Sequence, residues 1–305
     1  MEPAGEIVFY RLVAGYVKMQ LDLTESSRNA WKTFLNNQDN SGHAERHLIG
    51  QSIDTHVAAC FRSATEMTQR LKKDLCDLKP SVILEIGSST GLNCIALQKM
   101  FPESVVYGIE PEEEAVSVAV KMTSAMDSKT SVFFKGVGED VPLADGSVDL
   151  IVCHTVIEHV TDVQKVICEF SRLLSPKGVV HLDAPNYLWP YEPHLEIWTI
   201  PLLGKSFVAM TARLQGKGEK TDFLNHLQFV TPFQLEKSFR ECNLNWENRV
   251  FQKFLNLSED PASIKQYKMA ASLIAFLQKI KLGKLVVSFL TFAGIYPSVM
   301  YTLRK

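Results

Sequence analysis

The chain has 305 residues, 46% of them apolar and 22% charged, which is typical of a globular protein with one elaborated domain or two. Its formal net charge of −2 provides no general attraction to nucleic acid, so we expect no nucleic-acid partner. The six cysteines show no metal-ligand spacing and no secretory signal is recognisable, so we expect a reducing, cytoplasmic location and no metal site.

Residues 1–79 are expected to be helical. Apolar residues recur near helical spacing at Phe61, Met67, Leu71 and Leu75. Pro80 should end this helix before the first strand. Without a cysteine or a paired carboxylate beside them, three histidines of this stretch are interpreted as surface or core-edge residues: His43, His47 and His56.

Strands and helices alternate over residues 80–185. Strands are expected at Val82–Ile86, Val105–Ile109, Val132–Lys135, Val148–His154 and Val179–Asp183. Helices are expected at Leu92–Met100, Glu112–Met126 and Asp162–Leu174. This alternation predicts an α/β fold with a parallel sheet covered by helices on both faces, and ligands over the carboxyl ends of the strands.

The first strand leads into a glycine turn, Gly87-Ser-Ser-Thr-Gly91, and then a helix. Such a turn leaves backbone N–H groups and a helix N-terminus facing a ligand. Glu110 ends the next strand, where a carboxylate suits the two hydroxyls of a ribose. A dinucleotide-binding turn needs G-x-G-x-x-G, and the spacing here argues against that alternative and against an oxidoreductase.

Glu85, the glycine turn and the stretch Gly136–His159 together resemble the motifs of class I S-adenosylmethionine-dependent methyltransferases, over roughly residues 80–185. Ser89 stands at the usual middle glycine, and Val137 stands where family members often carry an acid for the adenine amine. The resemblance implies a Rossmann-like sheet of seven strands, the last antiparallel, in a core over residues 80–257. It also implies that residues 1–79 form a lid.

The cofactor implied by the resemblance is S-adenosyl-L-methionine. The residues expected to bind it are Glu85, Gly87, Ser88, Ser89, Gly91, Glu110, Pro111, Gly138, Glu139 and His154. Asp140 is an alternative to Glu139 at the adenine. Ile109 and Pro111 are candidates to enclose the ring, with plain core packing as the alternative for both.

Methyl transfer to an oxygen needs a base, and histidine titrates near neutral pH. His159 follows the fourth strand within a Glu-His pair, which in the resembling family lies near the methyl group or builds the pocket. His154 and His226 are further candidates. His226 precedes an aromatic residue and a Thr-Pro helix start, a segment that resembles small-molecule and glycan methyltransferases.

Residues 186–230 interrupt the alternation with many aromatics and prolines. We expect a cap over the carboxyl edge of the sheet that binds a small-molecule or lipid-linked acceptor, or an insertion that only covers the sheet. The candidate acceptor-binding residues are Tyr187, Tyr191, His194, Trp198 and His226.

Residues 258–305 combine a basic amphipathic stretch with an apolar one, and no acidic residue follows Asp260. A final strand is expected at Pro297–Arg304. The stretch 262–296 suits contact with an anionic membrane surface, and buried helices or a true anchor are the alternatives.

The sequence therefore predicts a methyltransferase that acts on a small or lipid-linked acceptor, with oxygen as the favoured atom and nitrogen and carbon as open alternatives. The alternative from another class is a non-catalytic subunit with the methyltransferase fold, which Ser89 and Val137 would permit.

Overall fold

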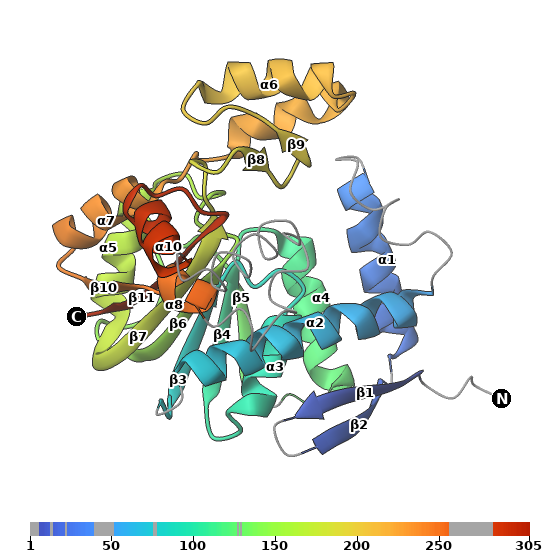
Figure 1. Ribbon diagram of the computed structural model, residues 1–305. Helices are drawn as coiled ribbons and strands as arrows, with labels where there is room; N and C mark the ends of the chain where they lie inside the picture. The colour runs from blue at the N-terminus through green and yellow to red at the C-terminus, as the bar shows by residue number, and fades with distance from the viewer. Residues whose placement is uncertain are drawn as a thin grey trace. The chain divides into compact units, whose positions relative to one another are not determined.

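A computed structural model describes residues 6–12, 15–21, 23–39, 52–75, 78–126, 128, 130–255 and 283–305 (Figure 1). The chain divides into two compact units, which are described one at a time. Unit 1 comprises Met1–Val152 with Arg172–Gly178, and unit 2 comprises Cys153–Ser171 with Val179–Lys305. The domain bounds expected from the sequence stay a prediction, and His43, His47 and the stretch 258–282 lie outside the described residues.

Seven strands form a mixed sheet in the order β10-β11-β7-β6-β3-β4-β5. The strands are β3 (Val82–Ile86), β4 (Val105–Glu110), β5 (Ser131–Lys135), β6 (Val148–His154), β7 (Leu174–Pro185), β10 (Asn245–Asn248) and β11 (Ser298–Arg304). β3 pairs with β4 and β4 with β5 in parallel, whereas β11 is antiparallel to its neighbours β7 and β10. The predicted seven-stranded sheet with an antiparallel last strand is confirmed.

Continuous apolar runs explain the central strands of unit 1. Ile83 and Leu84 on β3, and Leu150 and Ile151 on β6, are completely buried, as expected for strands covered on both faces. The helices that follow these strands are α3 (Leu92–Met100), α4 (Glu113–Ala125) and α5 (Val163–Leu173). Their bounds agree with the predicted helices to within a residue.

The start of the chain differs from the helical prediction. β1 (Glu6–Leu12) and β2 (Gly15–Leu21) form an antiparallel hairpin, and their sequences are rich in β-branched and aromatic residues that favour strands. Helices α1 (Glu25–Asp39) and α2 (Ile53–Asp74) follow. They share one apolar core with α3 and α4, formed by Trp31, Leu35, Val57, Phe61, Ile95, Val118 and Met122, among others.

The segment 186–230 of unit 2 folds around an apolar cluster of its own. It contains a small hairpin of β8 (Tyr191–Glu192) and β9 (Ile197–Trp198), then α6 (Gly204–Leu214) and η2 (Gly218–His226), and Figure 1 shows α6 beside this hairpin. The cluster consists of Leu195, Ile197, Val208, Ala212, Leu224 and Leu227.

Three helices complete unit 2. α7 (Pro232–Glu241) starts as predicted, because the Thr231 hydroxyl accepts the N–H of Gln234 and proline occupies the first turn. β10 ends at Asn248, whose side-chain oxygen accepts the N–H of Val250, and α8 (Val250–Leu255) begins there. α10 (Gly283–Phe292) precedes β11.

Within the described ranges, no helix is long and apolar enough to cross a membrane.

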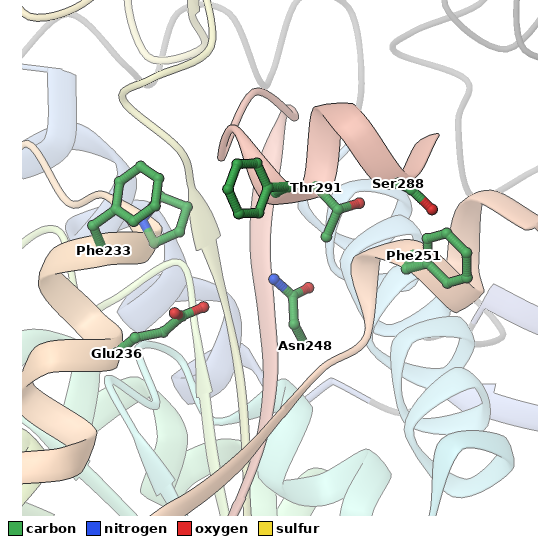
Figure 2. Close-up of a pocket in the computed structure, with 8 residues that line it drawn as sticks. Phe233, Glu236, Asn248, Phe251, Ser288 and Thr291 are labelled. Atoms are coloured by element: carbon green, nitrogen blue, oxygen red, sulfur yellow. The ribbon is translucent and has the colours of Figure 1, made fainter. Parts of the chain in front are cut away.

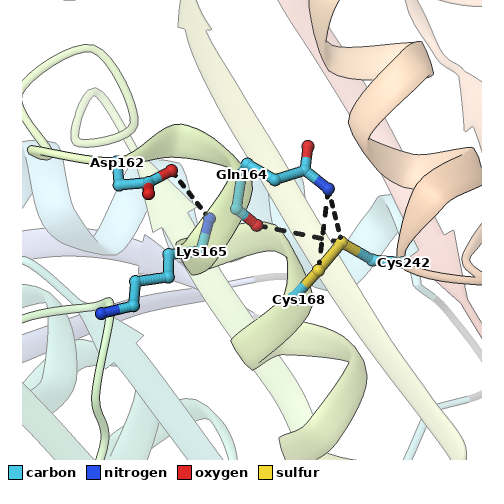
Figure 3. The surroundings of a disulfide bond; sticks show 5 residues. All are labelled: Asp162, Gln164, Lys165, Cys168 and Cys242. Atoms are coloured by element: carbon cyan, nitrogen blue, oxygen red, sulfur yellow. Dashed lines mark hydrogen bonds between the residues drawn. A yellow bond between two sulfur atoms is a disulfide. The ribbon is translucent and has the colours of Figure 1, made fainter.

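A disulfide joins Cys168 on α5 to Cys242 at the end of α7 (Figure 3). The side-chain amide of Gln164 donates to both sulfurs, at 3.7 Å and 3.2 Å. The spacing of the cysteines gave no sign of this pair. Disulfides are rare in a reducing cytosol, so the bond does not fit the expected compartment, and the cytoplasmic location stays a prediction.

Candidate cofactor site and a buried acid–histidine cluster

The glycine turn of unit 1 is fixed to the end of β4. The N–H groups of Gly87 and Ser88 both donate to the carbonyl of Ile109, at 2.9 Å and 3.1 Å. Gly87, Ser89 and Gly91 all have positive φ angles, of 70°, 46° and 76°. The backbone thus takes the left-handed conformation that glycine adopts most readily, and Ser89 adopts it as well.

Gly91 is also required by its neighbours. A Cβ atom at this position would lie 2.6 Å from the Phe133 ring and 2.7 Å from Cβ of Ala119. Any side chain here would therefore push apart α4, β5 and the start of α3. This contact accounts for the second glycine of the motif without reference to a ligand.

Glu110 lies directly beside the turn. Its Oε2 accepts the backbone N–H of Ser89 at 2.9 Å, and its Oε1 accepts the N–H of Glu112 at 3.1 Å. The turn follows the carboxyl end of β3 and Glu110 ends β4, and these two strands are parallel neighbours. The structure therefore brings together the turn and the carboxylate that the sequence analysis assigned to a nucleoside ligand.

Glu85 is buried at the end of β3, with 3% of its surface exposed. The thiol of Cys94, on the first turn of α3, donates to its Oε2 at 2.9 Å. Burial raises the pKa of Glu85 to about 7, although the hydrogen bonds from Cys94 and Asn93 act in the opposite direction. Sequence reasoning missed Cys94, since a lone apolar-looking cysteine on a helix gives no signal of a carboxylate partner.

Residues 136–140 form a turn after β5. The N–H of Gly136 donates to the carbonyl of Glu110 at 3.0 Å, and Val137 pairs with Asp140 in an isolated bridge. Gly138 is buried, Glu139 is half-buried, and the exposed Val137 offers no polar group. Ile109 is a core residue, because its side chain lies under Gly136 and is 1% exposed, whereas Pro111 is exposed.

In unit 2, His154 ends β6 and pairs with a second histidine. Its Nε2 lies 2.6 Å from Nδ1 of His181, a buried residue of β7. Nε2 of His154 is therefore already engaged in a hydrogen bond. The sequence analysis did not single out His181, since a histidine within an apolar strand looks like a core residue.

A separate cluster in unit 2 consists of Glu158, His159 and His194. Glu158 is completely buried, and its Oε1 lies 3.9 Å from Nε2 of both His159 and His194. The two imidazole rings meet edge to face with centroids 5.3 Å apart, and Phe223 contacts both. Residues predicted separately, one after the fourth strand and one in the cap, thus lie together.

Glu192 holds His194 in place. Its Oε1 lies 2.7 Å from Nδ1 of His194, and its two oxygens also accept the N–H groups of His194 and Leu195, at 3.2 Å and 2.6 Å. This bond leaves Nε2 of His194 as the atom that faces Glu158. Sequence reasoning missed Glu158 as part of a site with His194, because the two lie in segments far apart in the chain.

Burial shifts the protonation of this cluster. It raises the pKa of Glu158 to about 7, and it lowers the pKa of His159 to about 4, with His194 acting in the same direction on His159. His159 is therefore neutral at physiological pH and a weak proton acceptor. This favours the alternative in which His159 builds the pocket over the one in which it acts as general base.

The remaining predicted acceptor-binding residues occupy different surroundings. Tyr187 stacks on Phe229 with centroids 4.3 Å apart, and within the described part of the chain its buried hydroxyl has no hydrogen-bond partner. Tyr191 meets the exposed Trp198 edge to face across the β8–β9 hairpin. His226 is exposed at the end of η2 and does not belong to the acid–histidine cluster.

Comparisons with known proteins agree with the resemblance. Residues 84–182 match the family model of the methyltransferase domain. The uncharacterized methyltransferase YcgJ of Bacillus subtilis is 29% identical over 32% of this chain and 37% of its own length. A malonyl-[acyl-carrier protein] O-methyltransferase of Xylella fastidiosa is 29% identical over 38% of this chain and 39% of its own length. Norajmaline N-methyltransferase of Rauvolfia serpentina is 28% identical over 50% of this chain and 52% of its own length.

The chain thus spans between about a third and a half of the length of these curated relatives. Among solved structures, a protein of Galdieria sulphuraria proposed to be a sarcosine dimethylglycine methyltransferase shares the fold, with a TM-score of 0.51 and 15% identity. That alignment covers 92% of this chain and 98% of the other.

Residues 84–182 therefore form a class I methyltransferase domain, whose cofactor is S-adenosyl-L-methionine. The residues present fit this cofactor, because the exposed Ser89 of the turn lies beside the carboxylate of Glu110, a group able to accept hydrogen bonds from ribose hydroxyls. Ser88 adds a buried hydroxyl that has no hydrogen-bond partner among the described residues.

Proposed function

We propose that this protein transfers a methyl group from S-adenosyl-L-methionine to an oxygen of a small or lipid-linked acceptor. The hydrogen bond from Ser89 to Glu110 carries the proposal, since it joins the glycine turn to the carboxylate that the sequence analysis assigned to a ribose. The match of residues 84–182 to the methyltransferase domain supports it. S-adenosyl-L-methionine supplies a methyl group bonded to a positively charged sulfur.

In this proposal unit 1 binds the cofactor. Glu110 accepts hydrogen bonds from the ribose hydroxyls, and the turn Gly87–Gly91 lets the ligand approach the backbone. Glu85, with its pKa near neutrality, orients the start of α3 or meets the amino-acid end of the cofactor. The backbone of Gly138 and the side chain of Glu139 contact the adenine, and Pro111 covers the ring.

Unit 2 binds the acceptor. The aromatic side chains of Tyr187, Tyr191 and Trp198 suit a ring or a hydrocarbon better than a strongly charged group. When bound, S-adenosyl-L-methionine would supply the methyl group to the acceptor oxygen, and a base of the protein would take the proton of that oxygen. His226 is exposed and therefore accessible for this role, whereas His154 would first have to release His181.

A non-catalytic subunit is not favoured. Ser89 does not distort the turn, because it adopts the left-handed conformation and directs its N–H to Glu110. Two curated relatives methylate different atoms, since one is an O-methyltransferase and the other an N-methyltransferase. The assignment to oxygen rests on the candidate histidine bases.

Transfer of labelled methyl from S-adenosyl-L-methionine to a panel of quinols, hydroxylated lipids, sugars and amines tests the proposal. We expect label in a hydroxyl compound and at least a tenfold loss of turnover in His226→Ala. Label in amines alone would contradict methylation at oxygen. Cofactor binding without transfer to any class, combined with activation of another enzyme on mixing, would establish the non-catalytic alternative.

The lid remains part of the proposal. α1 and α2 share their core with α3 and α4, so a lid motion would have to open this core. Hydrogen exchange of the full chain with and without S-adenosylhomocysteine provides the test. We expect added protection in α1 and α2, and unchanged exchange there would remove the lid role.

Peripheral membrane contact is the second part of the proposal. α10 presents large apolar side chains at helical spacing, with Leu285, Phe289 and Phe292 exposed by 71%, 64% and 83%. In the sequence this helix follows a stretch rich in lysine, which would favour an anionic surface.

A pocket of about 600 Å³ lies beside this helix in unit 2 (Figure 2). Figure 2 shows Phe233 of α7 and Phe251 of α8 on either side of it. Two of its polar groups are bonded to the protein, since Glu236 accepts the Tyr301 hydroxyl at 2.7 Å and Asn248 donates to the Tyr296 hydroxyl at 2.9 Å. Three phenylalanines of its lining, Phe233, Phe251 and Phe292, provide apolar surface for a hydrocarbon chain of a lipid.

Co-sedimentation of the full chain with vesicles of phosphatidylcholine and phosphatidylserine tests this contact. We expect the wild-type chain to pellet, and the double variant Phe289→Glu with Phe292→Glu to stay in the supernatant. Leu214→Glu is the matched control, because Leu214 is equally exposed on α6. Equal pelleting of all three proteins, or none by any of them, would contradict the membrane contact.

A further inference from the structure

The carboxylate of Glu158 is the most unusual group in the part of the chain that the structure describes. It is completely buried, and neither of its oxygens accepts a hydrogen bond from any other residue that the structure describes. A buried carboxylate without hydrogen bonds is costly unless a positive charge compensates it. Its nearest polar neighbours are the Nε2 atoms of His159 and His194, each 3.9 Å from Oε1.

We propose that Glu158, His159 and His194 bind a divalent transition-metal ion, with Zn²⁺ as the best match. Two imidazoles and one carboxylate are the ligand set of several catalytic metal sites and suit zinc, iron and nickel better than magnesium or calcium. Each of the three residues offers one ligand atom, and these atoms all lie within 4.8 Å of one another.

The spacing of the ligand atoms suits an ion after a small movement. Ligand distances of about 2.1 Å in a tetrahedral site place the ligand atoms roughly 3.4 Å apart. The two Glu158–histidine distances of 3.9 Å exceed this value by about half an ångström, and the widest separation in the cluster, up to 4.8 Å, exceeds it by about 1.4 Å. His159 is partly exposed on a turn, so its side chain is able to move toward Glu158.

Glu192 supplies the supporting interaction that metal-binding histidines have. Metal ligands of this type usually bond their second ring nitrogen to a carboxylate, which fixes the ring and its tautomer. His194 does so, with Nδ1 2.7 Å from Oε1 of Glu192 and Nε2 facing Glu158. Glu192 itself is held by the backbone N–H groups of His194 and Leu195. The hydrogen bond thus leaves the Nε2 lone pair available for the ion.

A second carboxylate also borders the cluster. Glu192 lies 2.7 Å from Nδ1 of His194, and Glu158 faces the other side of the same ring, with its Oε1 3.9 Å from Nε2. A divalent ion held there would satisfy the buried carboxylate of Glu158.

Three protein ligands leave a coordination position for water or for another oxygen. This consequence rests on the proposed function: an acceptor hydroxyl bound there would lose its proton to a base more readily. Metal binding itself does not depend on methyl transfer. A binding experiment therefore tests the metal site and an activity assay tests methyl transfer, and either can be refuted without the other.

Calorimetric titration with ZnCl₂ of the full chain, after treatment with a chelator, tests the site. We expect one site, with Glu158→Gln and His194→Ala weakening it by more than about 100-fold. Glu192→Gln should weaken it by about 10- to 100-fold, as expected for a supporting carboxylate. His226→Ala is the matched control, since it removes a histidine of the same unit outside the cluster, and it should bind as the wild type does.

Binding of Co²⁺ gives a second readout, because a tetrahedral site with nitrogen and oxygen ligands produces visible absorption that depends on its ligands. Circular dichroism establishes that each variant is folded, and Glu158→Gln keeps the shape of the side chain. Zinc affinity that is equal in the wild type and in folded Glu158→Gln and His194→Ala would overturn the proposal. So would the absence of zinc binding by the wild-type chain.

Discussion

Backbone conformation at individual residues determines the shape of the candidate cofactor site. Ser89 stands in place of the usual glycine, yet its contribution to the site is its N–H, which donates to Glu110. A left-handed conformation costs a serine roughly 1–2 kcal/mol, which the hydrogen bond to a charged carboxylate offsets. The side chain at this position therefore matters less to the turn than its backbone does.

Gly91→Ala tests the packing of the turn. We expect a loss of about 2–4 kcal/mol in the free energy of unfolding, because the new Cβ would combine left-handed strain with contacts of 2.6 Å and 2.7 Å to Phe133 and Ala119. Gly146→Ala is the control, since Gly146 has a similar φ of 64° and its nearest neighbour would lie at 3.9 Å. Urea unfolding that shows equal losses in the two variants would disprove the packing argument.

Glu85 makes stability depend on pH. Burial raises its pKa from 4.5 to about 7, so the folded state holds a proton that the unfolded state releases between these values. Stability due to this group is therefore present below about pH 4.5 and is lost as pH rises to about 7, by roughly 3 kcal/mol. Because glutamine does not titrate, the free energy of unfolding of Glu85→Gln should fall by roughly 3 kcal/mol less than that of the wild type over this pH range.

Urea unfolding at a series of pH values measures this difference. Glu103→Gln, an exposed carboxylate of the same unit, is the control and should keep the slope of the wild type. If Glu85→Gln also kept that slope, the buried acid would not be the cause.

At the level of secondary-structure elements, a disulfide and a small apolar cluster stabilise the parts of unit 2 that lie outside the sheet. The Cys168–Cys242 disulfide joins α5 to the end of α7 across 74 residues of sequence. The cap segment is held by its own cluster of six buried apolar residues. Both features join residues that are distant in the sequence, and local patterns do not reveal such contacts.

Reduction of the disulfide should destabilise the protein by about 2–4 kcal/mol, because the long loop that it closes becomes free in the unfolded state. Cys168 is exposed, so a reductant reaches it. Thermal unfolding with and without dithiothreitol measures the effect in the wild type and in Cys168→Ala. The variant should be unaffected by reductant, and a wild type that is equally unaffected would indicate that the bond is absent in solution.

At the scale of the whole molecule, the alternation of strands and helices predicted the parallel part of the sheet, and the resemblance to class I methyltransferases implied its seven strands with the last one antiparallel. β3, α3 and β6 have the bounds that the sequence predicts, because apolar runs and glycines mark their ends. The β1–β2 hairpin was missed although β1 is rich in β-branched and aromatic residues, because the helical spacing of residues 61–75 does not extend to it. α8 was missed because a mixed stretch of six residues favours strand and helix about equally.

The candidate site was predictable in part. Gly87, Gly91 and Glu110 form a local motif with a physical reason for each residue, and the structure brings them together. The cluster of Glu158 with His194 was not predictable as a unit, because its members come from separate segments. The expectation that the chain has no metal site rested on local spacing alone, and the proposed metal site would replace it.

Calorimetric titration of the full chain with S-adenosylhomocysteine tests the central claim most directly. The account predicts one site in the wild type, weakened about 10- to 150-fold in Glu110→Gln by loss of charged hydrogen bonds worth roughly 1.5–3 kcal/mol. Glu103→Gln should bind as the wild type does. Absence of binding by the folded wild-type chain, or equal affinity in Glu110→Gln, would contradict the assignment of this edge of unit 1 to the cofactor.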